Sequence, residues 1–184
     1  MANSERSRLK DLILYNLEAG EAVLTDNNDI RVYTDGKEKF RALIEEMKQA
    51  KRYIHMQYYI IRNDELWQEV EKVLIQKARE GVAVRVLFDS MGCRTMKNRD
   101  WERLEKEGIQ VAEFFPALLG QLQLRVNYRN HRKIVVIDGR VGFVGGFNVG
   151  REYLGRDKKF GYWRDNHLCF ERAGGKAGGD RVFF

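Results

Sequence analysis

Residues 53–88 of the chain, YIHMQYYIIRNDELWQEVEKVLIQKAREGVAVRVLF, decide its fold class. Tyr53–Ile61 is almost continuously β-branched and aromatic, which is typical of a strand covered on both faces. Asp64–Glu80 follows with apolar residues at three- and four-residue spacing and ends at Gly81, so it is expected to be a helix. Val82–Phe88 then predicts a second buried strand. This order forms a βαβ unit, whose crossover favours parallel strands.

The sequence on either side continues the alternation. Outside the central unit, the pattern predicts a helix at Leu9–Leu17, a strand at Ile30–Thr34, helices at Lys37–Ala50 and Lys97–Glu107, and a strand at Ile109–Phe115. Past Pro116 the rhythm changes, and short strands are expected at Leu122–Tyr128, Arg132–Ile137 and Arg140–Val144. An Asp-Gly hairpin turn joins the last two. The predicted fold class is therefore α/β, with a mixed, largely parallel sheet flanked by helices.

Length and composition favour one compact domain. The 184 residues are 43% hydrophobic, which is enough for one substantial core. We expect an N-terminal extension over residues 1–29, the domain over 30–172 and a flexible, glycine-rich tail over 173–184. No apolar run approaches the roughly 20 residues of a membrane-spanning helix, so the chain is expected to be cytoplasmic or peripheral on the cytoplasmic side of the cell membrane. The separated Cys93 and Cys169 fit neither a disulfide framework nor a zinc site.

Basic residues are concentrated in one part of the chain. Lysine and arginine outnumber aspartate and glutamate by 33 to 27 overall, and by ten to three between Gly120 and Arg164. This stretch is expected to attract anions. Nucleic acid, anionic lipid headgroups and phosphorylated small molecules all fit, so charge alone does not choose among these partners.

Residues 131–148 carry the most specific pattern in the chain. They read HxKxxxxDxxxxxxGGxN, six fixed positions in eighteen. The fixed positions are His131, Lys133, Asp138, Gly145, Gly146 and Asn148. Such a set is far more specific than a lone histidine or a lone glycine pair, so we interpret the segment as a candidate catalytic site.

The spacing of this motif suits attack on a phosphate. His131 and Lys133 alternate on the predicted strand and so project from one face. A neutral histidine is a nucleophile near pH 7, and a lysine is a point-charge donor for a phosphate oxygen. Gly145 and Gly146 let backbone approach a ligand, and Asn148 adds an amide donor, so a phosphate cradle is predicted. Charge on the phosphoryl oxygens is expected to meet these donors rather than a metal.

A nucleophilic histidine needs an acceptor for its other ring nitrogen, and two carboxylates compete for this role. Asp138 is seven residues from His131, an odd offset on a strand, and lies in the Asp-Gly turn. It is counted among the candidate site residues, but we interpret it as mainly structural, binding turn amides. Asp165, on a later alternating segment, is the better candidate to orient His131.

Taken one at a time, these residues have ordinary explanations as surface decoration, a turn or a β-bulge. Two more histidines are ambiguous: His55 is better explained as a core or sheet-end histidine, with a position lining the site as the alternative, and His167 is similarly open. The aromatic residues near the strand ends are interpreted as core rather than as a substrate platform. They are Tyr58, Tyr59, Phe114 and Phe115.

The motif resembles the HKD motif of the phospholipase D superfamily. More narrowly, five segments are similar to the N-terminal half of bacterial cardiolipin synthases. They are YIHMQYYIIRND at 53–64, RVLFDSMGCR at 85–94, NHRKIVVID at 130–138, GGFNVGREYLG at 145–155 and WRDNH at 163–167. The likeness covers most of the chain, from Ile30 to Glu171.

The resemblance implies a phospholipase D-like fold and a ping-pong phosphatidyl transfer. A histidine attacks one phosphatidylglycerol to give a phosphatidyl-histidine, glycerol leaves, and a second phosphatidylglycerol takes the phosphatidyl group to form cardiolipin. By this likeness His131 is the nucleophile or its acid–base partner, and Lys133 and Asn148 bind the phosphate. No metal or other cofactor is implied, and the implied partners are anionic phospholipid and the membrane surface.

The likeness is to only part of such an enzyme. Members of the family carry two HKD motifs in one chain, and this chain has one. The missing acid–base group, commonly worth roughly 10²–10⁴ in rate, is expected from a homodimer or a separate second half. The family's N-terminal membrane helices have no counterpart, and the likeness ends after Arg172, so a truncated or half-length form is expected.

Two other functions stay open at this point. The first is a homodimeric nuclease with a single motif, which would bind DNA through the basic stretch. The second is a catalytically silent domain that binds anionic lipid or protein. The similarity to lipid enzymes across several strands favours phosphatidyl transfer over the nuclease.

Overall fold

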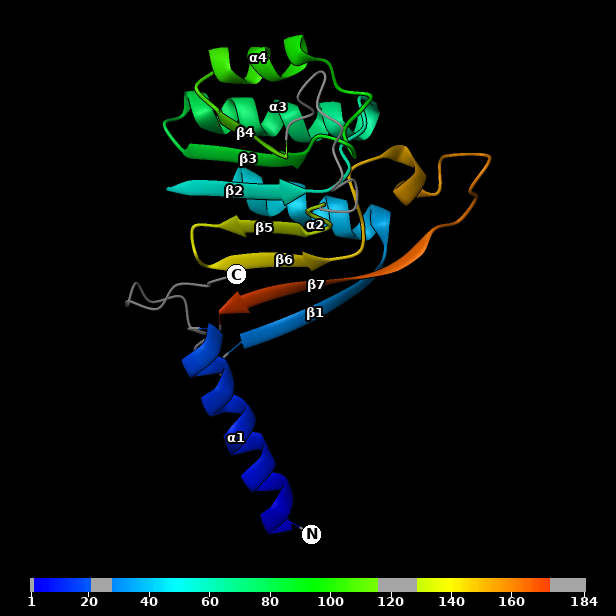
Figure 1. Ribbon diagram of the computed structural model, residues 1–184. Helices are drawn as coiled ribbons and strands as arrows, with labels where there is room; N and C mark the ends of the chain where they lie inside the picture. Colours follow the sequence, from blue (N-terminus) through cyan, green and yellow to red (C-terminus); the bar gives the residue numbers. More distant parts are fainter. Residues whose placement is uncertain (1, 21–27, 116–128, 173–184) are drawn as a thin grey trace.

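The computed structural model describes residues 2–20, 28–115 and 129–172 (Figure 1). Its helices are α1 (Ala2–Gly20), α2 (Gly36–Lys48), α3 (Glu65–Arg79), α4 (Asn98–Lys106) and a short 3₁₀ helix, η1 (Arg151–Leu154). Its strands are β1 (Asn28–Asp35), β2 (Tyr53–Tyr58), β3 (Ala83–Asp89), β4 (Gln110–Phe114), β5 (Lys133–Ile137), β6 (Val141–Gly145) and β7 (Arg164–Arg172).

The seven strands form one mixed sheet in the order β1-β7-β6-β5-β2-β3-β4, which confirms the α/β class. β2, β3 and β4 pair in parallel, whereas the other four pairs are antiparallel. The parallel part is thus smaller than expected, because a parallel pair needs a long crossover and only α3 and α4 supply one between neighbouring strands. β5 and β6 are joined by the predicted hairpin turn, in which Asp138 and Gly139 both have positive φ, 57° and 68°.

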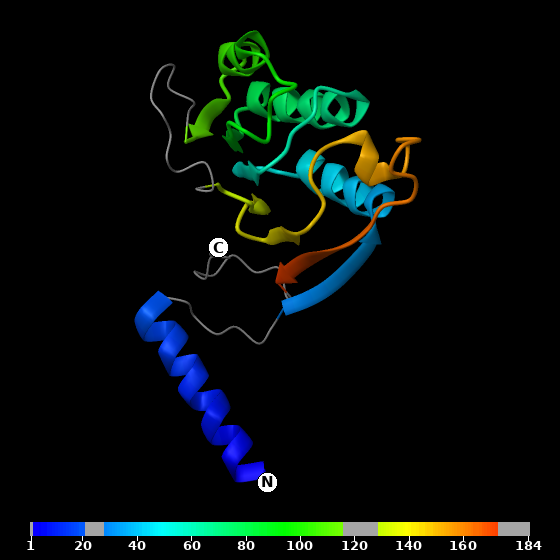
Figure 2. The same ribbon diagram turned by 45° about the vertical axis from the view of Figure 1, so that its right-hand side comes forward.

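Helices α2, α3 and α4 pack on one side of the sheet (Figure 2). α2 and α3 each begin after an aspartate, Asp35 and Asp64, whose carboxylate accepts hydrogen bonds from two backbone N–H groups of the first turn. Their apolar stripes face the strands, and together with alternate strand residues they form one continuous core. This core fixes the strand ends that carry the motif.

β7 is the element that the sequence pattern defined least. It pairs with both β6 and β1, so it lies inside the sheet and carries the segment that contains Asp165. The predicted strand Leu122–Tyr128 and the predicted flexible tail lie outside the described residues.

α1 is longer than the predicted helix Leu9–Leu17 and stands away from the sheet in both views (Figures 1 and 2). Its leucines are largely exposed. Within the described ranges, no helix combines the length and the apolar character that a bilayer crossing requires.

Candidate active site

The motif residues gather where several strands end at one edge of the sheet. β2 and β3 end at this edge, β5 begins there two residues after His131, and β6 ends there at Gly145. The start of β7 lies alongside, because Gly145 pairs with His167. In α/β sheets, ligands commonly bind beyond the carboxyl ends of parallel strands. The candidate site is therefore assembled from segments that are far apart in the sequence.

His131 and Lys133 are in direct contact. Lys133 Nζ is 3.1 Å from His131 Nδ1 and donates a 2.8 Å hydrogen bond to the His131 carbonyl oxygen. The geometry differs from the expected alternation, because β5 begins only at Lys133. His131 is exposed whereas Lys133 is buried, so the lysine reaches the histidine from beneath. The two predicted residues nevertheless meet at one point.

The environment lowers the pKa of both side chains, and it leaves Lys133 mostly protonated and His131 neutral near pH 7. Burial lowers the pKa of Lys133 to about 8, and the nearby Asp165 carboxylate opposes this shift. Burial and then the charge of Lys133 lower the pKa of His131, while Asp89 opposes. A histidine whose pKa is lowered is neutral near pH 7, which is the form that can attack phosphorus.

The contact also fixes the position of the proton on the His131 ring. An ammonium can only donate, so Nδ1 accepts from Lys133 and a neutral ring carries its proton on Nε2. Nε2 then lacks the lone pair needed for attack. A phosphate oxygen that draws Lys133 away would free Nδ1 to take the proton instead.

Tyr59 belongs to the site, although the sequence suggested a core role. Its ring centre is 4.5 Å from that of His131, with the planes tilted by 57°. Lys133 Nζ lies 5.3 Å from the same ring centre, within the range of a cation–π contact. The half-buried Tyr59 therefore limits the motion of both side chains.

Asp89 is a second residue that sequence reasoning missed. It is the last residue of β3 and is 1% exposed. Its carboxylate accepts hydrogen bonds from the backbone N–H of Asn130 at 3.0 Å and of Met91 at 2.9 Å. It thus anchors the residue that precedes His131. The available signal was an aspartate at the carboxyl end of a buried parallel strand.

Asp138 lies at the other end of β5 from His131 and has a structural role. Its carboxylate accepts hydrogen bonds from the backbone N–H groups of Lys51, Arg52 and Tyr53, at 2.8, 2.8 and 2.9 Å. These contacts agree with the interpretation of Asp138 as a residue that binds backbone amides. The bonded amides, however, belong to the two residues before β2 and to its first residue, and not to the turn that contains Asp138.

The two glycines make room for β7. A Cβ on Gly145 would collide with the carbonyl oxygen of Asn166 and lie 2.5 Å from the Cα of His167, and a Cβ on Gly146 would collide with the carboxylate of Asp165. The absence of a side chain thus lets the backbone of β7 approach Gly145 and the Asp165 side chain approach Gly146. The approach of a phosphate to these glycines stays a prediction.

Asn148 connects two segments of the chain through hydrogen bonds of its side chain. Its Oδ1 accepts from the backbone N–H of Ile60 at 3.0 Å, and its Nδ2 donates to the Tyr153 hydroxyl at 2.8 Å. The residue is buried, and these bonds tie the segment after β6 to the chain after β2. A contact of the remaining amide hydrogen with phosphate stays a prediction.

Asp165 is placed beside Lys133 more clearly than beside His131. Its charge raises the pKa of Lys133, and its Oδ1 accepts from the backbone N–H of Asn166 at 2.7 Å. Among the described residues, Asp89 is the carboxylate that acts on the pKa of His131. The orienting role of Asp165 therefore stays a prediction.

The two other histidines lie within the sheet. His55 is half-buried and stacks on Tyr53 at 4.6 Å between ring centres. His167 is fully buried and stacks on Phe147 at 6.1 Å, and neither ring nitrogen has a hydrogen-bond partner among the described residues. Burial, followed by the charges of Lys39 and Lys133, lowers the pKa of His167 to about 2, so the ring is a neutral core group.

Cys93 and Cys169 are free and buried. No cluster of three or more potential metal-ligating side chains occurs in residues 2–20, 28–115 and 129–172.

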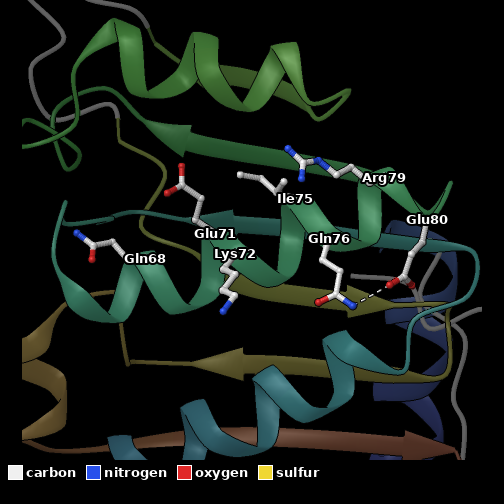
Figure 3. Close-up of a pocket in the computed structure, with 7 residues that line it drawn as sticks. All are labelled: Gln68, Glu71, Lys72, Ile75, Gln76, Arg79 and Glu80. Carbon is white, nitrogen blue, oxygen red and sulfur yellow. Dashed lines mark hydrogen bonds between the residues drawn. The ribbon is translucent and has the colours of Figure 1, made fainter.

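A shallow depression of about 520 Å³ lies elsewhere, on the outer surface of α3 (Figure 3). Polar and charged side chains line most of it, and Gln76 Nε2 donates to Glu80 Oε1 at 2.8 Å. None of the motif residues borders this depression.

Comparison with known proteins finds a family model that covers the motif residues. A family model described as "Cardiolipin synthase, PLD-like domain" matches residues 43–163, which include His131, Lys133 and Asn148. The chain belongs to this family. Cardiolipin synthase of Oceanobacillus iheyensis and the major cardiolipin synthase ClsA of Bacillus subtilis are each 52% identical to this PLD-like domain over 159 residues, 86% of the chain. A cardiolipin synthase of Staphylococcus aureus is 50% identical over 91% of the chain.

The PLD-like domain spans about a third of the length of these relatives, 33% to 34%. Solved structures support its fold at low sequence identity. NucT from Helicobacter pylori superposes with a TM-score of 0.58 at 16% identity, covering 78% of this chain and 86% of its own. A phosphatidylserine synthase of Haemophilus influenzae gives a TM-score of 0.61 at 20% identity and covers 78% of this chain and 33% of its own.

Proposed function

We propose that this PLD-like domain supplies one histidine nucleophile for a phosphatidyl transfer of the cardiolipin synthase type. The observation that carries the proposal is the contact of Lys133 Nζ with His131 Nδ1, because it places a cation and a neutral imidazole where one phosphate can meet both. The relatives at 50% to 52% identity are named cardiolipin synthases, which supports a transfer that forms cardiolipin, and phosphatidylglycerol is the substrate that we propose for it.

The first step of the proposed reaction starts with Lys133. A phosphate oxygen of phosphatidylglycerol accepts a hydrogen bond from the Lys133 ammonium, which then moves away from Nδ1 of His131. The ring proton moves from Nε2 to Nδ1, where it stays on the ring and donates a hydrogen bond to the Asp165 carboxylate, and Nε2 gains a lone pair. Nε2 attacks phosphorus, the bond from phosphorus to the glycerol oxygen breaks, and that oxygen takes a proton from a second histidine.

The second step reverses these roles. The second histidine removes the proton from a hydroxyl of another phosphatidylglycerol, whose oxygen attacks phosphorus. The phosphorus–nitrogen bond breaks and returns a neutral His131, with cardiolipin as the product. Asp89 and Tyr59 act throughout by holding the backbone before His131 and the face of its ring.

The second histidine must come from outside the single motif. Either a second copy of the chain or a separate second half would provide it, and a symmetric pair would place two His131 rings on one phosphate. We place the domain at the membrane surface, peripheral on the cytoplasmic side, because its substrate is a bilayer lipid.

One assay tests the proposal against both alternatives. The purified chain and a His131→Ala variant are incubated separately with phosphatidylglycerol vesicles and with DNA. Cardiolipin and glycerol formed only by the wild type support the proposal. DNA cleavage without lipid turnover would favour a nuclease, and binding without turnover of either would favour a silent domain.

A further inference from the structure

The segment between η1 and β7 has an unusual surface for a loop. Residues 156–164 read RDKKFGYWR and carry four basic residues, Arg156, Lys158, Lys159 and Arg164, and one acidic residue, Asp157. Two large aromatic side chains in the loop are open to solvent, with Phe160 49% and Tyr162 67% exposed. We call residues 156–164 the basic–aromatic loop. It projects from the edge of the sheet where β6 ends and β7 begins (Figure 1).

The loop is held in a defined shape by its one carboxylate residue. The Asp157 side chain accepts from the backbone N–H of Lys159 at 2.9 Å, and its carbonyl oxygen accepts from the N–H of Gly161 at 2.9 Å. Gly161 has a φ of 63°, which suits this tight turn. Asp157 is also 3.7 Å from the Arg151 guanidinium. The Asp157 carboxylate thus already has partners within the chain. The exposed aromatic rings lie on a hydrogen-bonded turn.

The positive charges of the loop are largely free. Among the ion pairs of the described residues, Arg156 meets Glu65 only at 4.0 Å, and Lys158, Lys159 and Arg164 meet no carboxylate. All four are exposed. Exposed cations next to exposed aromatic rings complement an anionic bilayer surface, where phosphates attract the cations and the rings enter the headgroup region.

A continuous set of contacts connects the loop to the candidate site. The Phe160 ring packs edge-on against Trp163 at 5.7 Å, and Trp163 packs edge-on against Tyr153 at 5.1 Å. The Tyr153 hydroxyl accepts from Asn148 Nδ2. Asp165 follows the loop directly in β7. The position of the loop on a surface is therefore coupled to the position of the motif.

We propose that the basic–aromatic loop is the surface by which this chain docks on an anionic phospholipid bilayer, with Phe160 and Tyr162 in the headgroup region and Lys158 and Lys159 on the lipid phosphates. This docking surface rests on the proposed function in one respect, the choice of phosphatidylglycerol as the lipid. Its residues, however, are different from those of the candidate active site. Docking here brings the edge of the sheet that bears His131 toward the headgroups.

Vesicle binding tests the proposal with the full chain. Binding is measured by co-sedimentation with phosphatidylglycerol vesicles and, for comparison, phosphatidylcholine vesicles. Lys158→Gln/Lys159→Gln is expected to weaken binding to phosphatidylglycerol by about 30-fold, since each lysine near an anionic surface contributes about 1 kcal/mol. Phe160→Ser/Tyr162→Ser is expected to weaken it by at least about tenfold.

Matched controls separate the loop from general charge effects. Lys72→Gln/Lys106→Gln removes two exposed lysines from α3 and α4 and is expected to change binding less than about threefold. Trp163 gives a second measurement in the wild type, because Trp67 and Trp101 are buried in the core. A lipid-borne quencher in the headgroup region is expected to reduce the Trp163 emission when vesicles are added.

The outcomes distinguish this proposal from the proposed function. Binding through the loop without cardiolipin formation would support the docking surface and contradict the proposed transferase activity of the chain. Equal binding by the loop variants and the wild type would overturn the docking surface, whatever the activity. The docking surface is also overturned if Leu9→Ser/Leu12→Ser in α1 abolishes binding while the loop variants do not, or if the loop lysines hold DNA but not vesicles.

Discussion

At the scale of single residues, the pairing of Lys133 with His131 is expected to determine when the proposed nucleophile is available. The ammonium donates to Nδ1 in the structure, so the ring proton lies on Nε2, the atom that would attack. Phosphate would compete for the same ammonium with a full negative charge and is therefore expected to displace the imidazole. The nucleophile is thus expected to become active only when substrate phosphate is present.

This leads to a prediction about the His131 tautomer. Nitrogen-15 NMR of the chain without phosphate is expected to show His131 neutral at about pH 7.5, above its lowered pKa, with its proton on Nε2. Inorganic phosphate is expected to shift the population toward Nδ1–H. In Lys133→Met, which cannot donate to Nδ1, the phosphate-dependent change is expected to disappear. A dominant Nδ1–H form in the phosphate-free wild type would contradict the mechanism.

His167 leads to a prediction about acid stability. Its pKa in the folded chain is about 2, compared with 6.5 as the ordinary value, so the unfolded chain binds the proton more readily between these pH values. Stability is therefore fully present above pH 6.5 and falls as the pH drops below it. The contribution of this one group amounts to a loss of about 2 kcal/mol in the free energy of unfolding at about pH 5 relative to about pH 8.

Urea denaturation at the two pH values measures this loss. His167→Phe keeps an aromatic ring beside Phe147 and cannot be protonated, so most of the pH dependence is expected to vanish in this variant. His55→Phe serves as the control, because the pKa of His55 is lowered less. An unchanged pH dependence in His167→Phe would show that another group is responsible.

The sequence predicted those contacts between motif residues that follow from local spacing. His131, Lys133 and the two glycines belong to one motif, and their proximity follows from the hairpin of β5 and β6. The roles of Asp89 and Tyr59 depend on tertiary contact, because the backbone amide that Asp89 binds lies 41 residues later. Sequence periodicity contains no information about such a meeting, so these two residues were not identified.

At the scale of elements, the β5–β6 hairpin and β7 divide the motif into a structural and a chemical part. The hairpin turn locks the loop before β2 through the Asp138 carboxylate, far from His131. β7 brings Asp165 across Gly146 toward the opposite end of the sheet. Loss of each carboxylate is therefore expected to have a different consequence.

Asp138→Ala leaves three backbone N–H groups without their acceptor and is expected to lower the free energy of unfolding by about 2 kcal/mol, measured by urea denaturation. Asp138→Asn retains one acceptor oxygen and should recover part of this stability. Asp165→Ala is expected to change stability by less than about 1 kcal/mol and to reduce transfer by at least about 100-fold. The reverse ranking of the two positions, by stability and by activity, would refute this division.

The elements that could be predicted are those with a strong local period. α2, β2, α3 and β3 each have a clear apolar stripe or run, bounded by a capping aspartate or a glycine. β7 mixes charged, polar and aromatic residues, since it lies between two strands and also serves the site. The number of parallel strands was also overestimated from the sequence. The direction of pairing depends on which distant strand becomes the neighbour, and local periodicity does not show this.

At the scale of the whole molecule, the described residues bring one histidine and one lysine of the motif into contact, whereas the proposed transfer needs two proton-exchanging groups. If two copies combine, each active site contains two His131 rings, and each ring has a different task in the two steps.

Mixing wild-type chain with His131→Ala at constant total concentration distinguishes a paired site from an independent one. If each site needs His131 from two copies, activity follows the square of the wild-type fraction, and an equal mixture retains about a quarter of the activity. Independent sites would retain about half. The pairing predicts, in addition, that specific activity rises with protein concentration until the pair is saturated, a dependence that gel filtration at the same concentrations should match. A linear response to the wild-type fraction would mean that the second proton-exchanging group lies within the same chain, among residues other than His131.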